Sequence, residues 1–490
     1  MKAFFIFSGL ADRIADRARG LQSPMSIPIT FPLKASKPAD LGGALLAHYA
    51  TLLAPSPVPD DARAAARTLQ ARRERLAVIV KVSETTSEAL ATELLAYEWQ
   101  LEQLQLRLDF AGTELGCRFV WRDAWKPKNK AEKTDLEWER VCVLFNAAAA
   151  LSFSAGHAMA RGPEQGGLRE AVGLYQRAAG CHERIHAIVR AAIWGLSPRW
   201  DPDSLPTELT LDFVSALRDL ALAQAQEAFY CKAVAERLSP SVCAKLAAAS
   251  AELFSSSKVF FDRPAVVSYI CGEAGLFSGQ DRSWVTRVAA GELRARAVAE
   301  EAAAAEAAAE AAGGASAKYG AQVARLGLAA SAAKRAAAAG SDLAERRFLE
   351  AEAGRVGAAA AAAAAENHSV YMEPVPPPAA LPRIEPRRMV KSTPSVDGGA
   401  VSSLAEAFPL LLPIDVAAKK TALRGEVRPT TTWPYSFTSK LSCTNQSSCY
   451  CPPSICIAHT IAILLHGQCA IYDPPPNPPL CMPYTIQYWQ

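Results

Sequence analysis

Four long segments in the middle of the chain constrain its fold most strongly. Each is rich in helix-forming residues, and glycine, proline or serine separates each from the next. They span residues 135–155, 167–196, 209–238 and 240–254. Ser239-Pro240 is a typical helix start, with serine as the N-cap and proline at the first helical position. Because helices joined by short breaks pack as antiparallel neighbours, the sequence predicts a mainly α fold of stacked helical hairpins, without a strict 34-residue repeat.

Two shorter stretches show the alternation of half-buried strands. Residues 26–33 (SIPITFPL) and 116–125 (GCRFVWRDAW) both place apolar side chains at every second position. Residues 84–108, by contrast, carry leucines close to the spacing of one helix face. We therefore expect a small β-sheet with helices between its strands.

The second half of the chain changes composition twice. Residues 289–366 are dominated by alanine, the residue with the best helix propensity, and two long helices meeting around Gly313-Gly314 and Gly340 fit this pattern. Residues 374–388 (PVPPPAALPRIEPRR) are rich in proline and predict an extended arm.

Both ends of the chain differ from its middle. Residues 1–24 are interpreted as an N-terminal extension, with Met25 an alternative start. Residues 426–490 form a tail rich in cysteine and proline that contains six of the twelve cysteines. This tail shows no strand or helix period, so we expect disorder and favour a non-functional tail from alternative splicing; a disulfide module and a zinc knot stay open. The other six cysteines are spread as buried, reduced thiols of a cytosolic protein would be.

Charge and hydropathy argue against a nucleic-acid ligand and against a transmembrane helix. The formal net charge is +3, and the lysines and arginines form no concentrated basic face, so a nucleic-acid ligand is not expected. No run of about 20 apolar residues occurs, so no transmembrane helix is expected.

The sharpest catalytic motif is His182-Glu183-Arg184-Ile185-His186. In the HExxH pattern, two histidines one helical turn apart bind zinc and the glutamate acts as general base. The third ligand of the pattern is missing, because the candidate Glu208 lies in a proline-rich loop. A zinc hydrolase at His182 and His186 is therefore a remote alternative to two surface histidines on an amphipathic helix. With no other catalytic constellation, we expect neither an enzyme nor a bound metal or cofactor.

Residues 222–233, LAQAQEAFYCKA, raise a different question, because two glutamines interrupt an otherwise apolar helix. Leu222, Gln226 and Phe229 share one stripe, and Val242 and Leu246 share one on the next helix. An apolar strip between neighbouring helices suits recognition of a helix in a groove. Gln224 and Gln226 are expected to fasten neighbouring helices by hydrogen bonds. The alternative is that all three apolar groups, Phe229, Val242 and Leu246, lie in the core.

Several stretches together resemble the BRO domain of Alix-type proteins, over residues 25–425. In chain order they are MSIPITFPLKASKPADL, LLAYEWQLEQL, FVWRDAW, WERVCVLFNAAAA, LAQAQEAFYCKA, VCAKLAAASAELF, KYGAQVARL and MVKSTPS. The resemblance implies a boomerang-shaped helical domain with a tetratricopeptide-like core and a small β-sheet.

The resemblance also implies a function. Such domains are non-enzymatic adaptors that bind the C-terminal amphipathic helix of an ESCRT-III subunit, a charged multivesicular body protein, in endosomal sorting and membrane scission. The family's groove residues fall on Phe229, Val242 and Leu246, and Glu164 is a loose match for an acidic one. A cytoplasmic protein recruited to endosomes, with indirect or peripheral membrane contact, is expected. The alternative is a BRO-domain scaffold for pH response or for a phosphatase.

Two departures from the family are visible. Residues 264–282 interrupt a helix that the family continues, and look like an insertion or unspliced sequence. The V-shaped second domain of full Alix proteins is not found, so its binding of viral and receptor tail motifs is not carried over.

Overall fold

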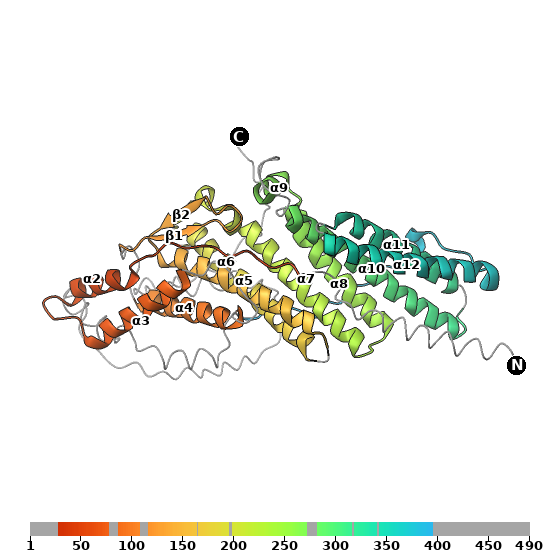
Figure 1. Cartoon of the computed structure of the whole chain (residues 1–490), viewed down its shortest axis with the longest axis horizontal. Helices are drawn as coiled ribbons and strands as arrows, with labels where there is room; N and C mark the ends of the chain where they lie inside the picture. The colour runs from red at the N-terminus through yellow and green to blue at the C-terminus, as the bar shows by residue number, and fades with distance from the viewer. Residues whose placement is uncertain are drawn as a thin grey trace, which may run out of the picture. The chain divides into compact units, whose positions relative to one another are not determined.

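Helices that follow one another in the chain also lie side by side in space (Figure 1). The computed structural model describes residues 28–77, 87–107, 116–163, 165–195, 198–271, 282–315, 318–340 and 343–394. All of them belong to one compact unit, residues 1–427. The predicted N-terminal extension 1–24 and the cysteine- and proline-rich tail 426–490 lie outside the described residues.

The four predicted central helices are confirmed. They are α5 (Leu136–Arg161), α6 (Gly167–Trp194), α7 (Leu211–Ala235) and α8 (Pro240–Phe261), and each packs on the next. The Asp135 carboxylate accepts a hydrogen bond from the Trp138 amide, 2.8 Å away, and so caps α5. Ser239 caps α8 in the same way, with Pro240 at the first helical position. The mainly α prediction therefore holds, and local capping residues explain where these helices begin.

The alanine-rich region forms three helices rather than the two expected. They are α10 (Arg282–Ala312), α11 (Lys318–Ala339) and α12 (Leu343–Glu366). The chain turns at Gly313-Gly314 and at Gly340, as the sequence predicted, so each break separates its own pair of helices. α10 lies so close to α8 that a Cβ added at Gly291 would sit 2.8 Å from the Phe254 ring. The small residues of α10 thus let the two helices approach closely, although each alanine buries little apolar area.

The N-terminal part contains three helices and, among the described residues, a two-stranded sheet. The helices are α2 (Leu41–Leu53), α3 (Asp60–Ala77) and α4 (Ser87–Arg107). Strands β1 (Phe119–Arg122) and β2 (Lys130–Lys133) are antiparallel, with Phe119 opposite Lys133 and Arg122 opposite Lys130. The small sheet is confirmed, although β2 has a charged sequence that no alternation predicted.

The strand expected at 26–33 is not formed over its described part, 28–33. Ile29 and Phe31 are buried, as the alternation predicted, but this segment pairs with no strand. The Gln224 side chain bonds both the amide and the carbonyl of Ile29, at 2.7 and 3.1 Å. Asn146 does the same for Lys34, at 2.7 and 2.9 Å. Amide side chains from α5 and α7 replace a neighbouring strand as hydrogen-bond partners.

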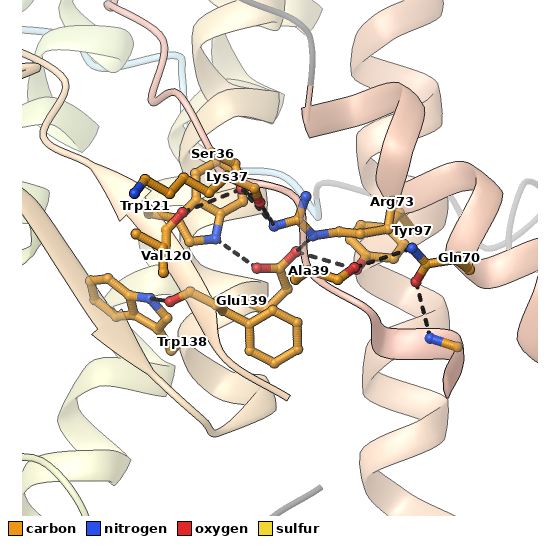
Figure 2. Close-up of polar contacts among 12 residues, drawn as sticks. Ser36, Lys37, Ala39, Gln70, Arg73, Tyr97, Val120, Trp121, Trp138 and Glu139 are labelled. Carbon is orange, nitrogen blue, oxygen red and sulfur yellow. Dashed lines mark hydrogen bonds and ion pairs between the residues drawn. The ribbon is translucent and has the colours of Figure 1, made fainter. Parts of the chain in front are cut away.

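A buried carboxylate, Glu139 on α5, ties the sheet and α3 to the helical stack (Figure 2). It lies 2.5 Å from the Arg73 guanidinium on α3, and it accepts hydrogen bonds from the Trp121 indole on β1, at 2.6 Å, and the Tyr97 hydroxyl on α4, at 3.2 Å. Glu139 and Arg73 are almost fully buried. Each buried charge is therefore paired and hydrogen-bonded, as burial in a low dielectric requires.

Part of the segment interpreted as an insertion is integral to the core. The short helix α9 (Pro264–Cys271) buries Val266, Tyr269 and Ile270. The Tyr269 hydroxyl lies 2.7 Å from an Asp123 oxygen and 2.8 Å from a Glu208 oxygen. Glu208 stands in a short 3-10 helix, η3 (Thr207–Leu209), and is ion-paired with the buried Lys34. Residues 272–281 lie outside the described residues.

The predicted proline-rich arm is extended and runs back along the helical stack. After a π-helical turn (Asn367–Tyr371), it contains one short 3-10 helix, η5 (Pro378–Ala380). Its amide at Arg387 donates to the Lys245 carbonyl on α8, and its amide at Thr393 donates to the Gln176 carbonyl on α6. The described part of the arm thus continues to residue 394 and crosses α8, α7 and α6 in that order.

Among the described residues, one helix, α5, is long and apolar enough to cross a membrane by composition. Of its most apolar window, 89% is buried inside the protein. This burial is what a central core helix shows, and α5 packs against both α4 and α6.

Candidate functional site

Phe229 is the residue of the 222–233 stretch that reaches the surface with its aromatic ring. Leu222, Ala225 and Gln226 on the same stripe of α7 are buried, whereas Phe229 is only partly buried. It stands in the last turns of α7, next to the buried Tyr230. The helix stripe predicted from the sequence therefore lies mostly in the core, and Phe229 is its one side chain that is accessible to a partner.

Phe229 lines an open groove of about 980 Å³. The sequence placed the apolar strip between α7 and α8, but the groove lies between α7 and the hairpin that joins α5 to α6. Its lining residues are Arg161, Pro163, Gln165, Gly166, Leu168, Arg169, Val172, Phe229, Lys232, Ala235 and Glu236. Three of its apolar members, Leu168 and Val172 on α6 and Phe229 on α7, form a floor that suits the apolar face of a helix.

The rim of this groove is mainly cationic. Three lining residues carry positive charge, Arg161, Arg169 and Lys232, against one lining carboxylate, Glu236. Arg161 is ion-paired with Glu170, 2.5 Å away. The Lys232 ammonium lies 5.7 Å from the centroid of the Phe229 ring and 2.8 Å from the Glu236 carboxylate. The Lys232 ammonium thus lies over the face of the aromatic ring, and Arg169 would offer complementary charge to a bound helix with carboxylates beside its apolar stripe.

The other predicted site residues occupy different positions. Val242 on α8 is partly buried, while Leu246, one turn later, is 1% exposed and belongs to the main core. Neither lines the groove that holds Phe229. Glu164 lies outside the described residues, although its neighbours Pro163 and Gln165 both line the groove.

Gln226 fastens neighbouring segments, as predicted. Its side-chain amide donates to the Leu246 carbonyl on α8, at 3.2 Å, and to the Arg387 carbonyl of the arm, at 3.0 Å. Its side-chain oxygen accepts from the Met389 amide, at 2.9 Å. Gln224 also accepts a hydrogen bond from the Tyr175 hydroxyl on α6, at 3.3 Å, besides holding Ile29. Both polar interruptions of the apolar helix are therefore explained by packing.

Comparison with known proteins identifies the family. Residues 28–428 match the model of a family described as BRO1-like domain. The chain belongs to this family. Programmed cell death 6-interacting protein of Homo sapiens is 28% identical over 240 residues, which are 48% of this chain and 26% of that protein. Vacuolar protein-sorting protein BRO1 of Gibberella zeae is 34% identical over 164 residues, which are 34% of this chain and 15% of that protein. The matched segments therefore span 26% or less of these relatives.

A solved structure supports the same assignment. The structure described as "ALIX BRO1 CHMP4C complex" superposes with a TM-score of 0.63 at 25% identity, and the match covers 76% of this chain and 96% of that one. The complex shows that a BRO1 domain similar to this chain binds CHMP4C.

The HExxH motif of this BRO1-like domain has a structural explanation. His182 is fully buried between Phe31 and Phe145, with ring centroids 5.1 and 6.1 Å away. Burial, and secondarily the positive charge of Arg218, lowers the pKa of His182 to about 3. No group of three or more His, Cys, Asp or Glu side chains in the described part of the chain could hold a metal ion. The expectation of two surface histidines is wrong for His182, which is a neutral core residue, while His186 is partly buried.

Sequence reasoning missed the α6 side of the groove. Leu168 and Val172 stand one turn apart at the start of α6, a spacing that could have indicated a second apolar contact surface. The contact of Lys232 with the Phe229 ring was also missed. Lys232 follows Phe229 by three residues, and this spacing places both side chains on one helix face. No local sequence pattern indicated that the arm passes Gln226, because the arm residues that bond Gln226 lie more than 160 residues later in the chain.

Proposed function

We propose that this BRO1-like domain is a non-enzymatic adaptor that binds the C-terminal amphipathic helix of an ESCRT-III subunit. In this role the protein is cytoplasmic, is recruited to endosomes through that partner, and acts in endosomal sorting and membrane scission. The observation that carries the proposal is the open groove with Phe229 at its apolar floor, on a fold similar to a domain solved with CHMP4C.

The groove supplies the two features that such a ligand needs. Leu168, Val172 and Phe229 offer apolar surface to one face of a helix. Arg169 at the rim favours carboxylates on the polar side of the ligand, whereas Lys232 is already ion-paired with Glu236. Phe229 acts as the anchor, because a large aromatic side chain in a pocket contributes most per residue to binding.

Val242 and Leu246 have supporting roles in this proposal. Val242, partly exposed, is a second contact on α8, and Leu246, buried one turn away in the core, holds α8 against α7. Substitution of Leu246 is therefore expected to act on stability before it acts on binding. Glu164, which lies outside the described residues, is proposed as an acidic contact of the same partner.

The test is binding of the full chain to a fluorescent peptide from the C-terminal helix of CHMP4C, measured by anisotropy. We expect micromolar binding, weakened about thirtyfold or more in Phe229→Asp, as for a hot-spot residue. Trp194→Asp is the matched control, because Trp194 is 67% exposed at the opposite end of α6. Each variant is compared with the parent by thermal unfolding. A folded parent that does not bind, or a folded Phe229→Asp protein that binds like the parent, would refute the proposal.

A further inference from the structure

A second exposed apolar surface lies where α12 ends. Val370 is 60% exposed, Met372 76% and Val375 50%, so three large apolar side chains face water within six residues. We call these three residues the α12 knob. Contiguous apolar surface of this kind is uncommon on a soluble protein unless a partner covers it, so the knob is a candidate contact surface.

The backbone of the knob is in an unfavourable conformation that the surrounding residues hold in place. Met372 has a φ of 52° and a ψ of 28°, in the left-handed region that favours glycine. The buried Asn367 accepts a hydrogen bond from the Met372 amide at its own carbonyl, at 2.5 Å. Its side chain bonds the carbonyl and the amide of Glu373, at 2.9 and 3.2 Å. A methionine kept where glycine would fit better indicates a role for its side chain.

The knob is also fixed to α11. The Tyr371 ring stacks on the Tyr319 ring, with centroids 3.4 Å apart and an angle of 6° between the planes. The Glu373 carboxylate accepts a hydrogen bond from the Gly320 amide, at 2.9 Å, and a Cβ added at Gly320 would sit 2.2 Å from the Pro374 carbonyl oxygen. The three apolar side chains are therefore presented on a rigid turn, so binding a partner costs little backbone entropy.

The knob and the groove lie at opposite ends of one row of helices. Helices α5, α6, α7, α8, α10, α11 and α12 each pack against the next (Figure 1). The groove lies between α7 and the hairpin of α5 and α6, whereas the knob rests on α11 at the end of α12. Since α8 and α10 stand between them, the knob of one chain is in place to meet the groove of a different copy.

The knob and the groove match in polarity and in charge. The floor of the groove is apolar, and the exposed Arg169 places a positive charge at its rim. Two carboxylates border the knob. Glu373 lies within it, and the exposed Glu366 accepts a hydrogen bond from the Tyr371 hydroxyl, at 3.4 Å. An apolar projection with carboxylates beside it is thus complementary to an apolar groove with a cation at its rim.

We infer that this chain self-associates head to tail, with the α12 knob of one copy in the groove of the next. The contact joins two different surfaces, so every assembly keeps one open groove and one open knob at its ends and grows by adding copies there. An interface this small is weak, and we expect reversible association at about 10–100 μM. The inference goes beyond the proposed function, but it places the knob in the groove proposed for the ESCRT-III helix, so the two ligands compete.

Sedimentation velocity of the full chain, over a concentration series that brackets about 10–100 μM, measures the association. The parent is expected to sediment faster as its concentration rises. Met372→Asp removes the knob and Phe229→Asp removes the groove, so each variant alone should sediment as a monomer. Leu343→Asp is the matched control, because Leu343 is 63% exposed at the other end of α12. This control should associate like the parent.

An equimolar mixture of Met372→Asp and Phe229→Asp is the decisive sample. The first variant keeps an intact groove and the second an intact knob, so the mixture should form a dimer that does not grow further. Thermal unfolding of each variant shows that it is folded, and Arg169→Glu replaces Phe229→Asp if the latter is not. A parent that stays monomeric, a Met372→Asp protein that associates like the parent, or a mixture without dimer would overturn the inference.

The CHMP4C peptide separates this inference from the proposed function. Added peptide should dissociate the parent assembly, and Met372→Asp should bind the peptide like the parent, because Met372 is no part of the groove. If the parent associates through knob and groove but does not bind the peptide, the proposed function fails and the inference stands. If the peptide binds through Phe229 and the parent stays monomeric, the inference fails and the proposed function stands.

Discussion

Gln226 on α7 accepts a hydrogen bond from the backbone amide of Met389, 2.9 Å away and 163 residues later in the chain. The same side chain donates to the Leu246 carbonyl of α8 and to the Arg387 carbonyl of the arm. One buried amide therefore joins three segments at the point where the arm passes the candidate groove, because glutamine offers both donors and an acceptor.

Gln226→Ala is expected to loosen the arm. It leaves buried backbone groups of Leu246 and the arm without partners, which costs about 1–3 kcal/mol of unfolding free energy. Trypsin should then cleave after Arg387 or Arg388 faster than in the parent, followed by mass spectrometry of the fragments. Gln165→Ala, at an exposed position, serves as control and should change neither property. Parent-like cleavage in Gln226→Ala would mean that other contacts alone hold the arm.

Glu139→Gln is expected to destabilise the protein by about 3–5 kcal/mol, because it leaves the buried Arg73 guanidinium without its counter-charge. Urea unfolding followed by circular dichroism measures the change. Glu132→Gln is the control, since its ion pair with Arg118, 3.4 Å apart, is exposed and contributes less than about 1 kcal/mol. Similar losses from the two substitutions would contradict the role assigned to the Glu139 network (Figure 2).

Stability is expected to fall on acidification through His182. Its pKa is about 3 in the folded protein, against about 6.5 for an unperturbed histidine. Between these values the unfolded chain binds more protons, so the unfolding free energy falls by about 1.4 kcal/mol per pH unit as the pH decreases from about 6.5 towards 3. This stabilisation is complete above pH 6.5.

His182→Leu removes that titration and retains a side chain of similar size. Between pH 7.5 and pH 5.0, the variant should lose about 2 kcal/mol less unfolding free energy than the parent. Chemical unfolding at both pH values gives the two differences. His368→Leu, at an exposed histidine, should keep the slope of the parent. Equal slopes in His182→Leu and the parent would show that His182 is not the group responsible.

Tyr269→Phe tests whether α9 is an integral part of the domain. Loss of the hydroxyl that bridges Asp123 and Glu208 is expected to cost about 1–3 kcal/mol of unfolding free energy. Ser268→Ala, on the exposed side of the same helix, should stay within about 0.5 kcal/mol of the parent. Thermal unfolding resolves this difference, and an unchanged Tyr269→Phe protein would make α9 a dispensable addition.

The sequence by itself determined the central helices, their starts at Asp135 and Ser239, and the breaks at Gly313-Gly314 and Gly340. These features depend on residues that are neighbours in the chain, because helix propensity, capping and glycine turns act over a few positions. The order of characteristic stretches also indicated the BRO1-like family, which the match over residues 28–428 confirmed. Phe229 was singled out from its place on a helix stripe.

Only the tertiary structure decided which side of that stripe is open. It buried Leu246, placed the groove beside Leu168 and Val172, and brought the arm to Gln226. It also gave the backbone groups of Ile29 and Lys34 amide side chains as hydrogen-bond partners in place of a strand. Each of these outcomes depends on contacts between segments far apart in the chain. The periodicity of a sequence shows that a side chain is apolar, but it does not show which segment packs against that side chain.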